Sequence, residues 1–201
     1  DEEDKGEDDD NNGKIDDIVG WDFYGNGQQG QNHREDNNPN DISGHGTHCS
    51  GDAAAVTNNN RGIASIGYEC SIMAVRTGTG LTVTYGYQGI EYAAREGAKV
   101  ISCSWGGYQS AQWAENVIDY AHEHDALVVC AAGNDNVNDD HFPSSYEHAM
   151  SVGATDNRDR KVNFSNWGEH IDVSAPGLNI YSTTVGGGYG NSSGTSMSCP
   201  I

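Results

Sequence analysis

Basic residues are scarce in this chain. Its 201 residues include 10 Lys and Arg against 30 Asp and Glu, which gives a formal net charge of −20 at pH 7. Nucleic acids and anionic lipids bind surfaces that are rich in Lys and Arg, because these side chains neutralise phosphate groups. The composition therefore argues against a nucleic-acid partner and against an anionic membrane surface.

Long apolar runs are also absent. No stretch approaches the roughly 18 apolar residues of a membrane-spanning helix. The N-terminus is acidic, whereas a signal peptide begins with a basic and then an apolar region. We therefore expect no membrane partner, and we find no export signal in these residues. The length fits one domain, residues 1–201, with an acidic lead-in over residues 1–17.

The cysteines do not have the spacing of a metal site. Five are present, an odd number, and none forms a Cys-x-x-Cys pair: Cys49, Cys70, Cys103, Cys130 and Cys199. This pattern indicates neither a zinc ribbon nor a complete disulfide framework. Cys103 and Cys130 fall on strands that we expect to be parallel neighbours, where disulfide geometry is rare. We expect free thiols.

Short apolar runs alternate with amphipathic helical patterns after the acidic lead-in. Strands are predicted at residues 18–23, 71–76, 99–104, 126–131, 151–154 and 171–174. Helices are predicted at residues 45–56, 85–96 and 111–122, the last behind a Ser110 cap. Residues 25–40 are expected to form a surface loop. This alternation predicts an α/β fold with a mostly parallel sheet covered by helices.

Three segments place side chains that can take part in catalysis next to small residues: Gly44-His45-Gly46-Thr47-His48, Ala131-Ala132-Gly133-Asn134 and Gly194-Thr195-Ser196-Met197-Ser198-Cys199-Pro200. A serine hydroxyl becomes a good nucleophile when a base takes its proton, and histidine suits that task near neutral pH. An Asn at the carboxyl end of a parallel strand is well placed to stabilise a developing oxyanion. Each feature alone is more often simple surface polarity.

Together, in this order, the three segments resemble the subtilisin-like serine proteases, the subtilases or peptidase S8 family, and most closely their thermitase and proteinase K branch. The resemblance extends over nearly the whole chain, through Trp21-Asp22-Phe23, Ala55-Val56-Thr57-Asn58-Asn59, Ser71-Ile72-Met73-Ala74-Val75-Arg76, Ser104-Trp105-Gly106-Gly107, Val152-Gly153-Ala154 and Ser174-Ala175-Pro176-Gly177. It implies a three-layer subtilisin-like fold, truncated at both ends, and a serine endopeptidase that cleaves internal peptide bonds.

The resemblance also implies roles for single residues. Ser196 would be the nucleophile, His45 the general base and then acid, and Asn134 an oxyanion donor beside the backbone N–H of Ser196. Peptide substrates would add as a β-strand between residues 78–82, which include Gly80, and the strand formed by Ser104, Trp105 and Gly106. Trp105 either fills an apolar subsite on the acyl side or is a core aromatic.

The sequence does not determine which residue is preferred before the cleaved bond. Asp135 and His141 are candidates to line its pocket, and Asp135 would tolerate a basic side chain. The family is usually secreted, and we expect a secreted monomer.

The third triad member of the family is missing. The family places it in an Asp-[Ser/Thr]-Gly turn upstream of the histidine, and this chain contains none; Asp41-Ile42-Ser43-Gly44 imitates the motif only superficially. The family core is thus cut before the aspartate strand and inside the serine helix. We expect these 201 residues to be weakly active or inactive. The alternative is a non-catalytic, acidic, Ca²⁺-dependent binding module on the same fold.

Two sets of oxygen ligands suggest structural Ca²⁺. Asp8, Asp10, Asn12 and Asp16 occupy positions of an EF-hand-like loop, but Val19 stands where its bidentate Glu would be. A solvated acidic tail is an equal alternative. The resemblance adds Asn59, in a loop that holds Ca²⁺ in the family.

Two neighbours of His45 offer competing chemistry. Cys49 lies one helical turn after His45, as in thermitase-like members, and implies mercurial sensitivity; the alternative is a small buried hydrophobe. His45 and His48 could serve a metal-dependent hydrolase, although the His-Glu-x-x-His spacing is absent.

Overall fold

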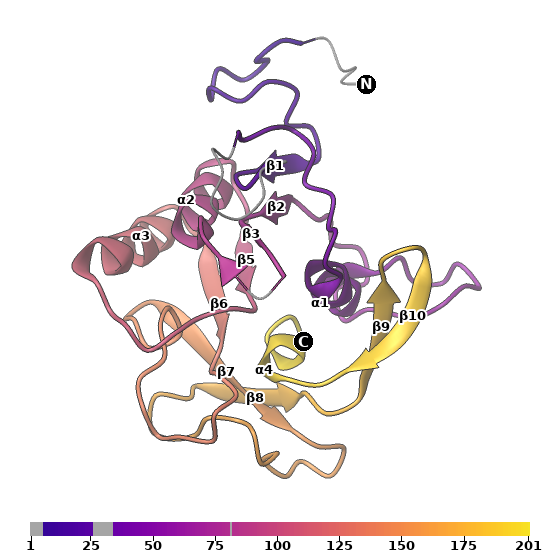
Figure 1. Cartoon of the computed structure of the whole chain (residues 1–201), viewed down its shortest axis with the longest axis vertical. Coiled ribbons are helices and arrows are strands. Elements are labelled where there is room, and N and C mark those ends of the chain that lie inside the picture. Colours follow the sequence, from indigo (N-terminus) through magenta and orange to yellow (C-terminus); the bar gives the residue numbers. More distant parts are fainter. Residues whose placement is uncertain (1–5, 26–33, 81) are drawn as a thin grey trace.

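A four-stranded parallel sheet lies at the centre of the computed structural model, which describes residues 6–25, 34–80 and 82–201 (Figure 1). Its strands, in spatial order, are β5 (Val100–Cys103), β6 (Leu127–Ala131), β7 (Ala149–Thr155) and β8 (Val173–Pro176). β5 and β6 pair with Cys103 opposite Cys130, as expected. All five cysteines are free thiols.

Successive residues of β6 face opposite sides of this sheet, because side chains alternate along a strand. Val128 and Cys130 pack with α2 (Gly86–Arg95) and α3 (Gln112–Glu123), whereas Val129 and Ala131 pack with Cys199, beside α4 (Thr195–Ser198). Helices therefore cover both faces. The predicted three-layer α/β arrangement is confirmed.

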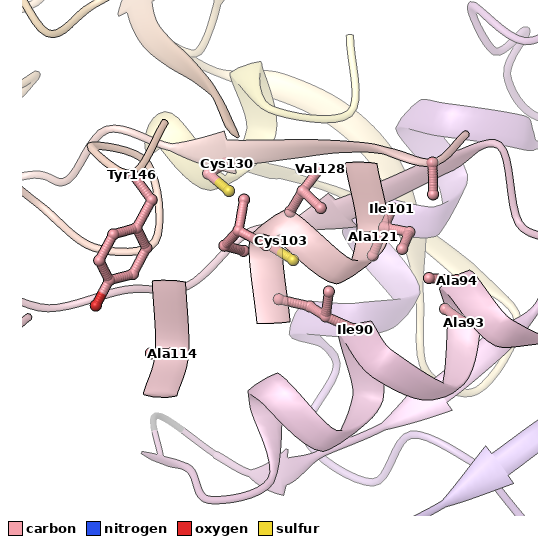
Figure 2. Packing of buried hydrophobic residues seen from close by; sticks show 12 residues of the cluster. Ile90, Ala93, Ala94, Ile101, Cys103, Ala114, Ala121, Val128, Cys130 and Tyr146 are labelled. Carbon is pink, nitrogen blue, oxygen red and sulfur yellow. The ribbon is translucent and has the colours of Figure 1, made fainter. Parts of the chain in front are cut away.

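The larger core cluster lies between the sheet and helices α2 and α3 (Figure 2). Ile90 from α2 and Ile118 from α3 are almost completely buried there. Ala93 and Ala94 of α2 and Ala121 of α3 are also buried in this cluster. This packing holds the carboxyl ends of β5 and β6 in place.

A second parallel pair stands apart from the central sheet. It consists of β1 (Gly20–Asp22) and β2 (Ala74–Arg76). Within the described part of the chain, β2 pairs with β1 alone and β5 with β6 alone. Helix α2 contacts both β2 and β5. A groove of about 2260 Å³ is lined by both strands and reaches His45 and Ser196.

Two hairpins were not predicted as strand pairs. The first joins β3 (Gly78–Thr79) to β4 (Thr82–Val83), and the second joins β9 (Ile180–Thr184) to β10 (Gly188–Ser192). Helix α1 (His45–Ala54) contacts β9: Ser182 Oγ donates to the carbonyl of His48 at 2.8 Å, and Thr183 Oγ1 donates to that of Thr47 at 2.7 Å. The second hairpin thus joins α1 to the chain that enters α4.

Some predicted details were wrong. The N-cap of α3 is Ala111, without a side-chain cap, so Ser110 does not serve; the phenol of Tyr146 accepts the Ala111 N–H at 2.8 Å instead. Strand β7 begins two residues before the predicted start. The predicted loop 25–40 falls partly outside the described residues, and Asp36 pairs with Asp22 in an isolated antiparallel bridge. Among the helices described, none has the length and apolarity needed to cross a membrane.

Candidate active site

His45 is the first residue of α1, and the preceding turn fixes where that helix begins. Gly44 adopts a left-handed φ of 96°, which suits glycine. Asp41 Oδ1 accepts the N–H groups of Ser43 and Gly44 at 2.7 and 2.9 Å, and its Oδ2 accepts the N–H and the hydroxyl of Thr47 at 2.7 and 2.8 Å. Asp41 thereby satisfies donors that a helix start leaves unpaired.

Opposing effects act on the pKa of Asp41. Burial alone would raise it, but the N–H groups of Gly44, Thr47 and Ser43 outweigh burial and hold the pKa well below its ordinary value. The carboxylate is therefore charged at neutral pH. The comparison with the Asp-[Ser/Thr]-Gly motif does not reveal that Asp41 accepts the N–H groups at the start of α1. The position of Asp41, three residues before the glycine at which the helix begins, is the sequence feature that indicates this role.

The surroundings of the His45 imidazole shift its pKa. Desolvation lowers its pKa below 6.5, the nearby charge of Asp41 opposes this shift, and His48 adds to it. Most His45 side chains are therefore neutral at pH 7. A neutral imidazole can accept a proton, which is what a general base must do.

Ser196 is the second residue of α4 and is half-buried. Its Oγ donates to the carbonyl of Ser104 at 3.2 Å, and Ser104 Oγ donates to the carbonyl of Ser196 at 2.7 Å. The Ser196 N–H has no hydrogen-bond partner among the described residues. The end of β5 therefore holds the serine, while one N–H at the helix start remains available.

Cys49 links the His45 side chain to the Ser196 backbone. Its Sγ lies 3.9 Å from His45 Nε2 and donates to the carbonyl of Ser196 at 3.4 Å. His45 and Ser196 thus come to the same place from opposite ends of the chain, although the described residues include no direct hydrogen bond between them. Burial raises the pKa of the Cys49 thiol to about 11, so this thiol is protonated at neutral pH.

Asn134 follows the end of β6 and reaches over α4. Its Oδ1 accepts the N–H of Thr195 at 2.8 Å and the Thr195 hydroxyl at 3.0 Å. With Oδ1 held, Nδ2 has no partner among the described residues, and Asn134 is exposed. The N–H groups of Asn134 Nδ2 are therefore free beside the backbone N–H of Ser196. An oxyanion site requires such free donors.

The predicted substrate-binding residues lie at two places around this site. Trp105 follows Ser104 and is half-buried; its ring meets that of Tyr87 edge-on, with centroids 5.4 Å apart, and packs at the margin of the core cluster. Both alternatives for Trp105 remain compatible with this position. Gly106 is exposed, and Gly80 lies in the turn after β3 with φ +57° and open space around it.

The predicted calcium ligands do not gather at one point. Asp8 and Asp10 both accept the backbone N–H of Asn12, at 3.1 and 3.0 Å, whereas Asp16 accepts that of Gly6 at 2.8 Å. Asn59 Oδ1 accepts the N–H of Arg61 in a separate turn at 2.9 Å. Asp8, Asp10 and Asn12 share a turn, but among the described residues no group of three or more Asp, Glu, His or Cys side chains is placed to hold a metal ion.

His48, the partner that a metal-dependent hydrolase would need, is buried inside the fold. Its Nδ1 lies 3.3 Å from Asp52 Oδ2, and its Nε2 lies 3.2 Å from the carbonyl of Gly190 in β10. Both ring nitrogens therefore face groups of α1 and the second hairpin. The ring holds the hairpin against the helix.

Comparison with known proteins agrees with this geometry. A model of the subtilase family matches residues 9–201. Thermitase of Thermoactinomyces vulgaris is 44% identical over 192 residues, covering 94% of this chain and 64% of that protein. A thermophilic serine proteinase of Bacillus sp. strain AK1 is 42% identical over 192 residues, covering 94% of this chain and 45% of that protein.

Solved structures of proteases share this fold. A protease from Pseudoalteromonas arctica PAMC 21717 superposes with a TM-score of 0.82 at 28% identity, covering 90% of this chain and 68% of that one. The chain spans less than two thirds of the length of the two sequence relatives named above. The family match, the thermitase-like sequence and the shared fold establish that this chain belongs to the subtilase family.

Proposed function

We propose that these residues form most of the catalytic domain of a serine endopeptidase that cleaves internal peptide bonds through an acyl-enzyme on Ser196. The observation that carries this proposal is the meeting of three segments: His45 and Ser196 both contact Cys49, and Asn134 is anchored to the residue before Ser196. Family membership supports the same chemistry. Among residues 6–25, 34–80 and 82–201, no contact favours the non-catalytic alternative.

The proposed reaction follows from these positions. Ser196 Oγ turns from the Ser104 carbonyl, attacks the substrate carbonyl carbon and gives its proton to His45. The carbonyl electron pair moves onto oxygen, which accepts hydrogen bonds from Asn134 Nδ2 and the Ser196 N–H. His45 then protonates the amine as the C–N bond breaks. Water, deprotonated by His45, attacks the acyl carbon, and His45 returns this proton to Ser196 Oγ as the ester bond breaks.

The missing carboxylate has a natural place in the sheet. We infer that the domain is incomplete over residues 1–201 and that another strand belongs in the groove between β2 and β5. Both edges lack a partner within the described residues, and the groove leads to His45 and Ser196. A parallel strand there would end near the imidazole, where an aspartate could orient it. Residues 1–17 would be the lead-in from that strand.

We also propose how the protein binds its substrate, which ion it holds and where it acts. Peptides would add as a β-strand between residues 78–82 and 104–106. The turn of Asp8, Asp10 and Asn12 would hold a structural Ca²⁺. We also propose a secreted monomer, in keeping with the family; the acidic surface suits neither nucleic acid nor anionic lipid.

Active-site labelling tests the proposal. A biotinylated fluorophosphonate should label Ser196, identified by peptide mass spectrometry, in the full-length chain that includes the segment before Asp1. That chain should hydrolyse a chromogenic peptide, and its Ser196→Ala variant should not. Residues 1–201 alone should turn over about four orders of magnitude more slowly, the loss known for subtilisin without its aspartate. Label on another residue, or full turnover by Ser196→Ala, would refute it.

A further inference from the structure

Asn166 is buried beside the loop that carries Asn134. Only 1% of Asn166 is exposed. Its backbone N–H donates to the carbonyl of Gly133 at 3.0 Å, and its Nδ2 donates to the carbonyl of Ala132 at 2.9 Å. Asn166 therefore binds both residues that lead from the end of β6 to Asn134.

The same side chain binds the backbone that leaves Asn134. Asn166 Oδ1 accepts the N–H of Asp135 at 3.0 Å and the N–H of Val137 at 3.3 Å. Because backbone N–H groups only donate and carbonyls only accept, these partners fix which end of the Asn166 amide is Oδ1 and which is Nδ2. Asn166 thus holds the chain on both sides of Asn134.

The remaining hydrogen of the Asn166 amide also has a partner. Asn166 Nδ2 donates to the hydroxyl of Tyr108 at 3.2 Å, and this hydroxyl donates to the carboxylate of Asp135. The amide therefore uses both of its acceptor sites and both of its donor hydrogens. Gly133 has a left-handed φ of 100°, and a Cβ added to it would come within 2.4 Å of Asn166 Nδ2. The turn at Gly133 and the buried amide thus fit closely together.

The Asn134 side chain is held at one end of its amide. Thr195 binds Oδ1, whereas Nδ2 has no partner among the described residues. The position of Nδ2 therefore depends on where the backbone of Asn134 lies as well as on Thr195. A misplacement of about 1 Å at a reacting group can cost about a hundredfold in rate.

We propose that Asn166 is a positioning residue: by fixing residues 132–137, it keeps Asn134 Nδ2 within hydrogen-bond reach of the oxyanion. This inference rests on the proposed function, because that oxyanion arises only during acyl transfer. The Asn166 side chain bonds to residues 132–137 and to Tyr108, so it acts through Asn134. Thr195 orients the Asn134 amide, and Asn166 sets the place of the Asn134 backbone.

A double-mutant cycle on kcat tests this inference in the full-length chain that includes the segment before Asp1. Asn166→Ser, whose side chain is too short to reach all these partners, should lower kcat on a chromogenic peptide about tenfold to a hundredfold and change KM little. In an Asn134→Ala background the same substitution should change kcat by no more than about twofold, because the group that Asn166 positions is gone. An equal loss in both backgrounds, or no loss in either, would overturn the inference.

Asn166→Asp repeats the cycle with a different defect, so that the test does not depend on one variant. Aspartate has the shape of asparagine and keeps an acceptor for the N–H groups of Asp135 and Val137, but it places an oxygen against the carbonyl of Ala132. This variant should also lower kcat, and the loss should again disappear in the Asn134→Ala background.

Tyr146→Phe is the matched control. Tyr146 is also buried, and its hydroxyl accepts the N–H of Ala111 at 2.8 Å and donates to its carbonyl at 3.2 Å. Losing these bonds at the start of α3 should lower Tm, as losing those of Asn166 should, but kcat should stay at the wild-type value. A comparable fall in kcat with Tyr146→Phe would attribute the effect to lost stability and count against the inference.

The inference and the proposed function can fail separately. If the wild-type full-length chain does not hydrolyse the peptide, the proposed function fails, and NMR relaxation then tests the position of Asn134 directly. The order parameter of the Asn134 side-chain amide should fall in both Asn166 variants and remain at the wild-type value in Tyr146→Phe. Unchanged order parameters in the Asn166 variants would overturn the inference.

Discussion

Asn134 Oδ1 accepts both the backbone N–H and the side-chain hydroxyl of Thr195, at 2.8 and 3.0 Å. The Thr195 hydroxyl in turn accepts the N–H of Gly133 at 3.2 Å. Thr195 is completely buried, so these bonds are shielded from water. The oxyanion donor is thus positioned by the residue next to the nucleophile.

Thr195→Val should weaken this arrangement. The variant leaves the Gly133 N–H without its partner and removes one of two anchors from Asn134. We expect a loss of about 1–3 kcal/mol in the free energy of unfolding. In the full-length chain kcat should fall more than KM changes, because the oxyanion is bound most tightly in the transition state. Thr195→Ser keeps the hydroxyl and is the control; equal effects of the two variants would contradict this reading.

The ionisation of His45 can be followed by NMR titration of residues 1–201. Its pKa should lie below 6.5, because desolvation disfavours the imidazolium. Asp41→Asn should lower the pKa further, because the carboxylate favours the charged ring. Asp156→Asn, at an exposed turn, should leave it unchanged. A His45 pKa above 6.5, or a rise in Asp41→Asn, would be inconsistent with the structure.

Acid unfolding should reveal the capping role of Asp41. Its folded-state pKa is depressed, so its contribution to stability is complete above its ordinary value of 3.8 and disappears as the pH falls towards the folded value. Asp41→Asn should cost about 0.5–2 kcal/mol at pH 7, as loss of a helix cap does. The difference from wild type should shrink below about pH 4. A gap that stays constant down to pH 2 would show that the charge is unimportant.

The cysteines should differ in reactivity. Cys49 has a pKa of about 11 and is half-buried, whereas Cys70 is exposed. Because alkylation requires the thiolate, iodoacetamide at pH 7.5 should modify Cys70 well before Cys49. Peptide mass spectrometry over a time course gives both rates. Cys49→Ala should remain labelled by the fluorophosphonate in the full-length chain, since Ser196 is the proposed nucleophile; faster alkylation at Cys49 would contradict the assignment.

Calorimetry can test the proposed Ca²⁺ site. An ion that binds only the folded state raises Tm by mass action. We expect a higher Tm in Ca²⁺ than in EDTA, and loss of that difference in Asp8→Ala. Asp159→Ala, an acidic residue at another turn, should retain it. Identical melting curves for the wild type in the two buffers would eliminate this site.

Much of the fold could be predicted because its signals are local. The helical spacing of Ile90, Ala93 and Ala94 and the apolar run 127–131 are sufficient to identify α2 and β6. The hairpin β9–β10 escaped prediction because its strands contain Gly, Ser, Thr and Tyr without clear alternation. Its pairing depends on contacts with α1, which the sequence does not display.

The site was predicted only in part, for a similar reason. His45, Ser196 and Asn134 belong to short motifs, so the family resemblance located them. The roles of Asp41, Thr195 and Asn166 arise from hydrogen bonds to particular backbone groups. Such relations exist only once distant segments meet.

Hairpin β9–β10 also has a mechanical consequence. One of its strands is fastened to the carbonyls of Thr47 and His48, and the other runs within a few residues to Gly194. A small rocking of α1 would therefore carry α4 along with it. His45 in α1 and Ser196 in α4 are therefore connected through the same hairpin. We expect the distance between these two residues to be kept on warming that makes the surface loops more mobile.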